Sequence, residues 1–272
     1  MMRPMSVRRG AGQHAFSAVS ALLFLASAAA TIVWCRWMAT ASSMPAEMPM
    51  PGGWTMSMAW MRMPDQTWAG AAASFLGMWV VMMVAMMLPS LLPMLRRYRA
   101  AVGGPGEPRL GRLTALVGAG YFFVWTLLGL AAFPLGVALA EVEMRLPAVA
   151  RAVPAAVGIV VLLSGLVQLT PWKARHLACC REMPGRGRMV PAGAGAAWRH
   201  GVRLGIHCGY CCAGLMAILL VVGIMELRAM AVVTAAITVE RLVPAGERVA
   251  RATGTVVVVA GLVLIARAAG LG

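Results

Sequence analysis

Long apolar stretches separated by short polar or basic segments run through the whole chain. A helix needs roughly 20 apolar residues to cross the hydrocarbon core of a membrane. Six stretches are about that long or longer, and we predict each as a membrane-spanning helix: 15–38, 67–95, 113–139, 153–169, 204–225 and 253–271. No alternating pattern typical of β-strands is present. The pattern therefore predicts an all-α, polytopic transmembrane bundle of six to seven helices, forming one domain over residues 1–272.

A seventh apolar run, 229–239, is short for a membrane span. At 1.5 Å per residue it covers about 17–22 Å, against a hydrocarbon core of about 30 Å. It is either a tilted or re-entrant half-helix or a seventh span that leaves the C-terminus opposite the N-terminus. The first apolar stretch raises a similar choice, because Ala28-Ala29-Ala30 resembles a signal-peptidase site. Its length favours an uncleaved anchor.

Composition and charge agree with a membrane location. The chain is 61% hydrophobic and only 12% charged, about half the charge of a soluble domain, so we expect the lipid bilayer to surround most of it. The net charge is +15, but the basic residues lie between apolar stretches rather than in one patch, and we expect no nucleic-acid partner.

The distribution of basic residues predicts the orientation. Eighteen of the 24 lysines and arginines fall on alternate connecting segments, which the positive-inside rule places in the cytoplasm. The N-terminus is then cytoplasmic, the Met- and Pro-rich loop 39–66 is extracytoplasmic, and loop 171–204 is cytoplasmic. We expect a multi-pass protein of a bacterial inner membrane.

Cysteines supply the sharpest chemical signal, since five of the six fall between residues 179 and 212. Such clustering differs from a disulfide framework spread over a small secreted domain. The later group reads His207-Cys208-Gly209-Tyr210-Cys211-Cys212 and contains a C-x-x-C pair with a third thiol. Cys208 and Cys212 share one face of a helix, and thiolates so placed can bind Zn²⁺ or Cu⁺.

The earlier group consists of His176, Cys179 and Cys180. Both groups flank loop 171–204, and folding of that loop would bring their ligands together around one metal ion. Two other interpretations stay open. Free cysteine is also a small apolar residue that packs well in buried helices, and Cys208 with Cys211 could instead form a redox pair.

Methionines form a second soft-ligand pattern. In the second stretch Met78, Met82 and Met86 make one row at helical spacing, and Met83 and Met87 make a neighbouring row. Thioethers favour Cu⁺, although methionine also simply packs well. We expect Pro89 and Pro93 to kink or end this helix. The outer loop repeats an M-x-M pattern typical of copper-binding segments or of a low-complexity linker: Met48-Pro49-Met50, Met56-Ser57-Met58 and Met61-Arg62-Met63.

At these residues the chain resembles an uncharacterised bacterial family of predicted metal-binding integral membrane proteins. The matching positions extend over roughly 170 residues: Trp79 with Met82 to Pro89, Gln168 to Pro171, Lys173, Leu177, Cys180-Arg181, Gly205 to Cys212, Leu215-Met216, Gly223 to Met225, Glu240-Arg241 and Pro244. This chain departs from the pattern at His176, which replaces a cysteine, and at Tyr210, Ala213 and Glu226. The resemblance implies metal binding, with copper favoured, and supplies no reaction.

We therefore expect a membrane protein that handles copper, or alternatively zinc, in transport, insertion or chaperoning. A metallochaperone or a larger membrane complex would be its partner. One alternative is a thiol–disulfide oxidoreductase using Cys208 and Cys211, and another is a structural subunit. No Ser/His/Asp or paired-carboxylate motif indicates a hydrolase, so an enzyme is the less favoured reading. Glu226 and Glu240, which flank the short run, are expected to pair with Arg228 and Arg241.

Overall fold

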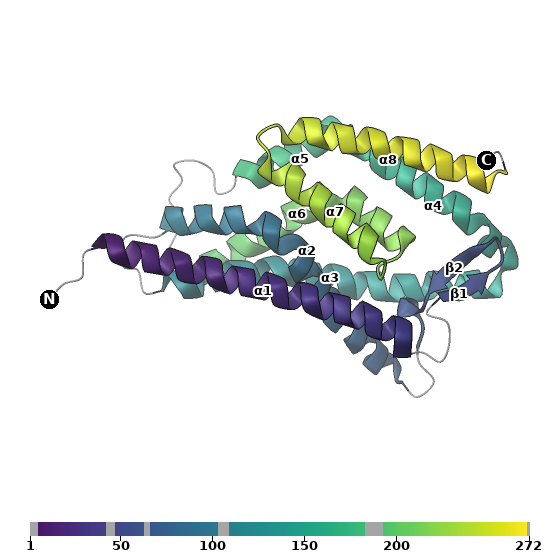
Figure 1. The fold of residues 1–272 in the computed structure, drawn as a ribbon, viewed down its shortest axis with the longest axis horizontal. Helices are drawn as coiled ribbons and strands as arrows, with labels where there is room; N and C mark the ends of the chain where they lie inside the picture. The colour runs from purple at the N-terminus through teal and green to yellow at the C-terminus, as the bar shows by residue number, and fades with distance from the viewer. Residues whose placement is uncertain (1–4, 42–46, 63–65, 103–108, 183–192, 271–272) are drawn as a thin grey trace.

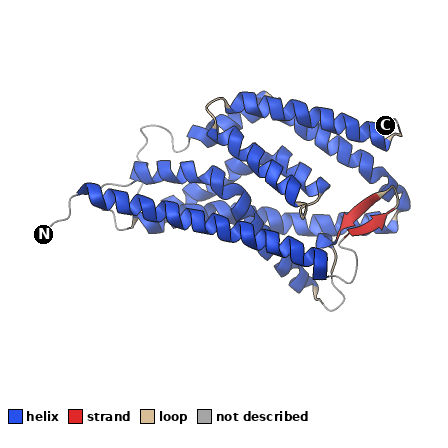
Figure 2. Ribbon diagram, viewed as in Figure 1, coloured by secondary structure: helices blue, strands red, loops and turns tan. Residues whose placement is uncertain are grey.

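Helices make up almost all of the computed structural model of the protein, which describes residues 5–41, 47–62, 66–102, 109–182 and 193–270 (Figure 2). The predicted all-α bundle is confirmed. In the described residues the elements are α1 (Met5–Ala41), β1 (Glu47–Met50), β2 (Trp54–Ser57), a 3₁₀ turn (Met58–Trp60), α2 (Trp68–Val102), α3 (Leu110–Arg145), α4 (Pro147–Gln168), α5 (Pro171–Glu182), α6 (Ala194–Val222), α7 (Leu227–Leu242) and α8 (Gly246–Ala268).

Six of these helices, α1, α2, α3, α4, α6 and α8, are long and apolar enough to cross a membrane. They correspond to the six predicted stretches. Several extend beyond the predicted bounds, because polar or basic residues continue the helix outside its apolar part: α6 begins at Ala194 rather than at residue 204. The helix α2 also runs through Pro89 and Pro93 without ending. Large side chains such as Leu22 and Val256 point outward with 70% and 69% exposure, as expected for a surface that faces lipid.

The short run forms α7, which is not among the six candidate spans. It follows a turn in which Gly223 adopts a positive φ of 130°, a conformation that favours glycine. Its 16 residues cover about 24 Å at 1.5 Å per residue. In Figure 1 the N- and C-termini lie at opposite ends of the bundle, with the C-terminus at the end that carries the two strands. The helix α7 therefore brings the chain back toward the end of the bundle where α5 lies (Figure 1).

Small residues set the closest helix contacts, as is common in membrane bundles. A Cβ atom at Gly201 of α6 would meet the backbone of Val117 in α3, and one at Gly205 would meet Tyr121. The helices α4 and α8 pack in the same way through four glycines: Gly158, Gly165, Gly254 and Gly261. The α3–α6 contact fixes the position of α6 along its axis relative to Tyr121 of α3.

The Met- and Pro-rich loop holds a hairpin that sequence analysis did not predict. The strands β1 and β2 pair antiparallel, with Met48 opposite Met56, and the turn uses Gly52 and Gly53 at positive φ. The indole of Trp54 donates a hydrogen bond to the carbonyl of Ala150 at 2.8 Å. The hairpin is therefore tied to the start of α4. Strands of four residues, one of them containing Pro49, are too short to show an alternating pattern.

Loop 171–204 is largely helical rather than irregular. Residues 171–182 form α5, and residues 194–204 begin α6, while 183–192 lie outside the described residues. The helix α5 packs on α6 and lies near α4 and α7 at the end of the bundle. This packing brings the two cysteine groups into the same region.

Candidate metal centre

Four cysteines from α5 and α6 converge inside the bundle. Cys180, Cys208, Cys211 and Cys212 are all buried, with exposures of 0–3%. The sulfur atoms of Cys208 and Cys212 lie 3.5 Å apart. A hydrogen bond with the Cys211 side chain, followed by burial, raises the pKa of the Cys180 thiol, while the charge of Arg241 lowers it. The folding of loop 171–204 thus joins Cys180 to the three later thiols.

The neighbouring helix α3 holds Cys208 in place. The hydroxyl of Tyr121 lies 2.8 Å from the Cys208 sulfur, and Tyr121 is fully buried. This contact depends on the close approach of α3 at Gly205. The Cys212 thiol also donates a hydrogen bond to the carbonyl of Cys208, one turn earlier, at 2.7 Å. The thiols therefore occupy a fixed position on the helix.

A buried cation lies among these sulfurs. Arg241 of α7 is only 6% exposed, and its Nη2 atom lies 4.0 Å from the Cys180 sulfur and 3.9 Å from the Cys212 sulfur. Its Nη1 atom donates to the Ser90 hydroxyl at 3.2 Å. Within the described part of the chain its Nε atom has no hydrogen-bond partner. Sequence analysis paired Arg241 with Glu240, and this pairing is wrong.

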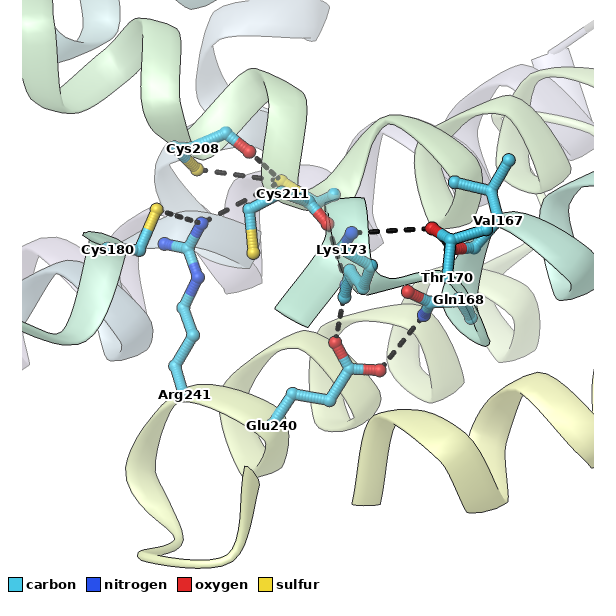
Figure 3. A network of polar contacts seen from close by, with 10 residues as sticks. Val167, Gln168, Thr170, Lys173, Cys180, Cys208, Cys211, Glu240 and Arg241 are labelled. Carbon is cyan, nitrogen blue, oxygen red and sulfur yellow. Dashed lines mark hydrogen bonds and ion pairs between the residues drawn. The ribbon is translucent and has the colours of Figure 1, made fainter. Parts of the chain in front are cut away.

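Glu240 instead joins a second buried network, drawn in Figure 3. Its carboxylate lies 2.7 Å from Lys173 Nζ and accepts a hydrogen bond from Gln168 at 3.0 Å. Lys173 Nζ also donates to the Cys211 carbonyl at 2.6 Å. A buried ion pair requires such additional hydrogen bonds. This network fixes the C-x-x-C turn of α6 relative to α4, α5 and α7.

His176, Cys179 and His207 do not join the buried thiols. They lie half-exposed on the outer side of the α5–α6 contact. The Cys179 sulfur is 3.8 Å from His207 Nδ1, and the rings of His176 and His207 are 6.1 Å apart. The structure therefore divides the expected ligand set into a buried thiol group and an outer Cys/His group.

The methionine rows of α2 are buried: Met78, Met82, Met83, Met86 and Met87 have exposures of 0–5%. Ser90 is the next member of the row that contains Met82 and Met86, at the same spacing of four residues. Because Arg241 contacts both Ser90 and the thiols, the row leads to the cysteine group. Of the methionines in loop 39–66, Met56 is buried at 2% exposure, and Met44 and Met63 lie outside the described residues.

The buried group suits a soft metal ion by its chemistry. Four sulfur donors shielded from water favour Cu⁺, which thiolates and thioethers select. In the described residues no set of three or more His, Cys, Asp or Glu side chains already has the arrangement of a metal site. The Arg241 guanidinium lies within 4.0 Å of both the Cys180 and the Cys212 sulfur.

Comparison with known proteins identifies the family. No curated protein and no solved structure matches the chain. Residues 76–264 match the PpoB2 family, which is described as a copper chaperone. The matched region runs from α2 to α8 and contains both cysteine groups, the methionine rows and the two buried networks. The chain belongs to the PpoB2 copper chaperone family.

Proposed function

We propose that the chain is a membrane-embedded copper chaperone that holds Cu⁺ on Cys180, Cys208, Cys211 and Cys212. The observation that carries the proposal is the convergence of these four buried thiols from α5 and α6 in one place. Membership of a copper chaperone family supports copper rather than zinc as the cargo.

The surroundings of the thiols suit an anionic copper–thiolate centre. Three or four thiolates around one Cu⁺ carry a net negative charge, which is costly to bury in an apolar bundle. Arg241 supplies positive charge beside the sulfurs, whereas Lys173, which donates to the Cys211 carbonyl, is paired with Glu240. Both cations are buried and come from helices that pack on α6. Arg241 can therefore offset part of the negative charge of the cluster.

The methionine row of α2 supplies a path for the ion. Met78, Met82 and Met86 are spaced one turn apart and continue to Ser90, which contacts Arg241. Thioethers bind Cu⁺ more weakly than thiolates do, so a row of them can pass the ion toward the cysteines. We propose that the outer methionines, including the Met48–Met56 pair, collect or release copper at the other end.

The proposal includes a location and a partner. The chain would lie in a bacterial inner membrane, and the distribution of its basic segments supports a cytoplasmic N-terminus. A metallochaperone or a larger membrane complex would exchange copper with the chain. A thiol–disulfide oxidoreductase is less well supported by this geometry. Cys208 and Cys211 are only 0% and 3% exposed, and thiol exchange requires access for the attacking sulfur.

Copper content tests the proposal directly. The purified, reduced chain in detergent is loaded with Cu⁺, passed over a desalting column and analysed for copper, beside a Cys208→Ser/Cys211→Ser/Cys212→Ser variant. Cys35→Ser is the matched control, because Cys35 is a buried cysteine of α1 far from the cluster in sequence. We expect the triple variant to lose one bound copper and the control to keep it. Equal copper in all three proteins would contradict the proposal.

A further inference from the structure

Adjacent residues on α5 and α6 point to different sides of the contact between the two helices. Cys180 and Cys208 are buried, whereas their neighbours Cys179 and His207 are half-exposed. Successive residues of a helix are rotated by about 100°, since there are 3.6 residues per turn. The same two helices therefore carry an inner pair and an outer pair of candidate metal ligands, and the two side chains of the outer pair, Cys179 and His207, are in contact.

The outer pair has the separation of two ligands of one ion. The Cys179 sulfur lies 3.8 Å from His207 Nδ1 and 4.0 Å from Nε2. A thiolate binds a metal such as Zn²⁺ at about 2.3 Å and an imidazole at about 2.0 Å. With these lengths the 3.8 Å separation gives an angle at the ion of about 120°, which suits three or four ligands.

His176 can complete the outer site. It lies three residues before Cys179, on the same side of α5, and its ring is 6.1 Å from that of His207. The side chain is half-exposed and packs against Trp172 at 4.5 Å between ring centroids. His176 is therefore the nearest candidate for a third ligand beside Cys179 and His207.

From this geometry we infer that Cys179, His207 and His176 form a second metal site on the outer side of the α5–α6 contact. This outer site exchanges Cu⁺ with the buried thiols on the other side of the contact. The inference rests on the proposed function. The outer set holds one sulfur and two nitrogens, so it binds Cu⁺ more weakly than four sulfurs do. Its partial exposure lets an incoming donor reach the ion, and Cys180 and Cys208 follow directly in the chain.

Protection of Cys179 from alkylation tests the outer site. The full chain in detergent is treated with N-ethylmaleimide, with and without two equivalents of Cu⁺, and modification of Cys179 is followed by peptide mass spectrometry. Because a metal-bound thiolate is a poor nucleophile, we expect copper to slow alkylation about tenfold or more. In His207→Ala the protection is lost. In His200→Ala it remains, since His200 lies on the same helix but stacks on Tyr98.

Two further results separate the outer site from the proposed function. In the Cys208→Ser/Cys211→Ser/Cys212→Ser variant, one equivalent of copper should still protect Cys179, because the outer ligands are intact. Loss of protection in that variant, or its absence in the unmodified chain, would overturn the outer site. Failure of the proposed function has a different signature: the triple variant would retain as much copper as the unmodified chain.

Discussion

At the residue scale, the centre combines side chains that sequence indicated with others that it did not. The convergence of Cys180 with Cys208, Cys211 and Cys212 could be expected from their clustering in the sequence. Arg241 was missed because a single arginine at the end of a short apolar run reads as an interfacial charge. Its position beside the sulfurs depends on how α7 packs against α5 and α6, and the local sequence does not predict that packing.

Removing the positive charge of Arg241 should weaken copper binding. In Arg241→Gln the buried copper–thiolate centre loses a compensating charge, and we expect Cu⁺ affinity to fall about tenfold or more, which is about 1.4 kcal/mol. Arg241→Lys keeps the charge and should recover part of the affinity. Competition with a Cu⁺ chelator measures the effect, with Arg248→Gln as an exposed control on α8. Unchanged affinity in Arg241→Gln would show that the charge of Arg241 does not stabilise bound copper.

At the element scale, helical phase explains why the candidate ligands divide into two groups. Cys179 and Cys180 are neighbours in sequence, but α5 turns them toward different environments. Sequence analysis treated residues 171–204 as a loop, because a glycine-rich and basic composition does not predict a short helix such as α5. The existence of the long helices could be predicted from apolar length alone, whereas their exact ends could not.

The contact between α3 and α6 should be sensitive to a single methyl group. A Cβ atom in Gly201→Ala would meet the Val117 backbone, and such overpacking typically costs about 1–3 kcal/mol. We expect a lower melting temperature in detergent, together with faster alkylation of Cys208 as the Tyr121 contact loosens. Gly195→Ala, in open space at the start of the same helix, is the control. An equal melting temperature for both variants would show that the contact tolerates the methyl group.

At the scale of the whole molecule, the termini lie at opposite ends of the bundle (Figure 1). Sequence analysis left six or seven passes open, because 229–239 is short for a span. In the structure α7 runs back along the bundle after the Gly223 turn. The composition of residues 229–239 could not predict the direction of α7, because the direction of a short helix depends on the turn before it.

This arrangement predicts that the chain ends on opposite sides of the membrane. A cysteine-free chain carrying one new cysteine at Trp54, in β2, or one appended after Gly272 should react with a membrane-impermeant maleimide added to intact cells. A new cysteine at Arg199, at the start of α6, should react only after the cells are opened. Labelling of the C-terminal cysteine only in opened cells would mean that α7 does not reverse the chain across the membrane.

The chemical identity of the buried centre is the central question, and X-ray absorption at the copper edge addresses it most directly. The sample is a Cys179→Ser/His207→Ala chain loaded with one equivalent of Cu⁺, so that the outer ligands cannot contribute. The account predicts a first coordination shell made of sulfur alone, which disappears when Cys208, Cys211 and Cys212 are also changed to serine. A shell of nitrogen or oxygen, or a spectrum that survives the loss of those three sulfurs, would contradict it.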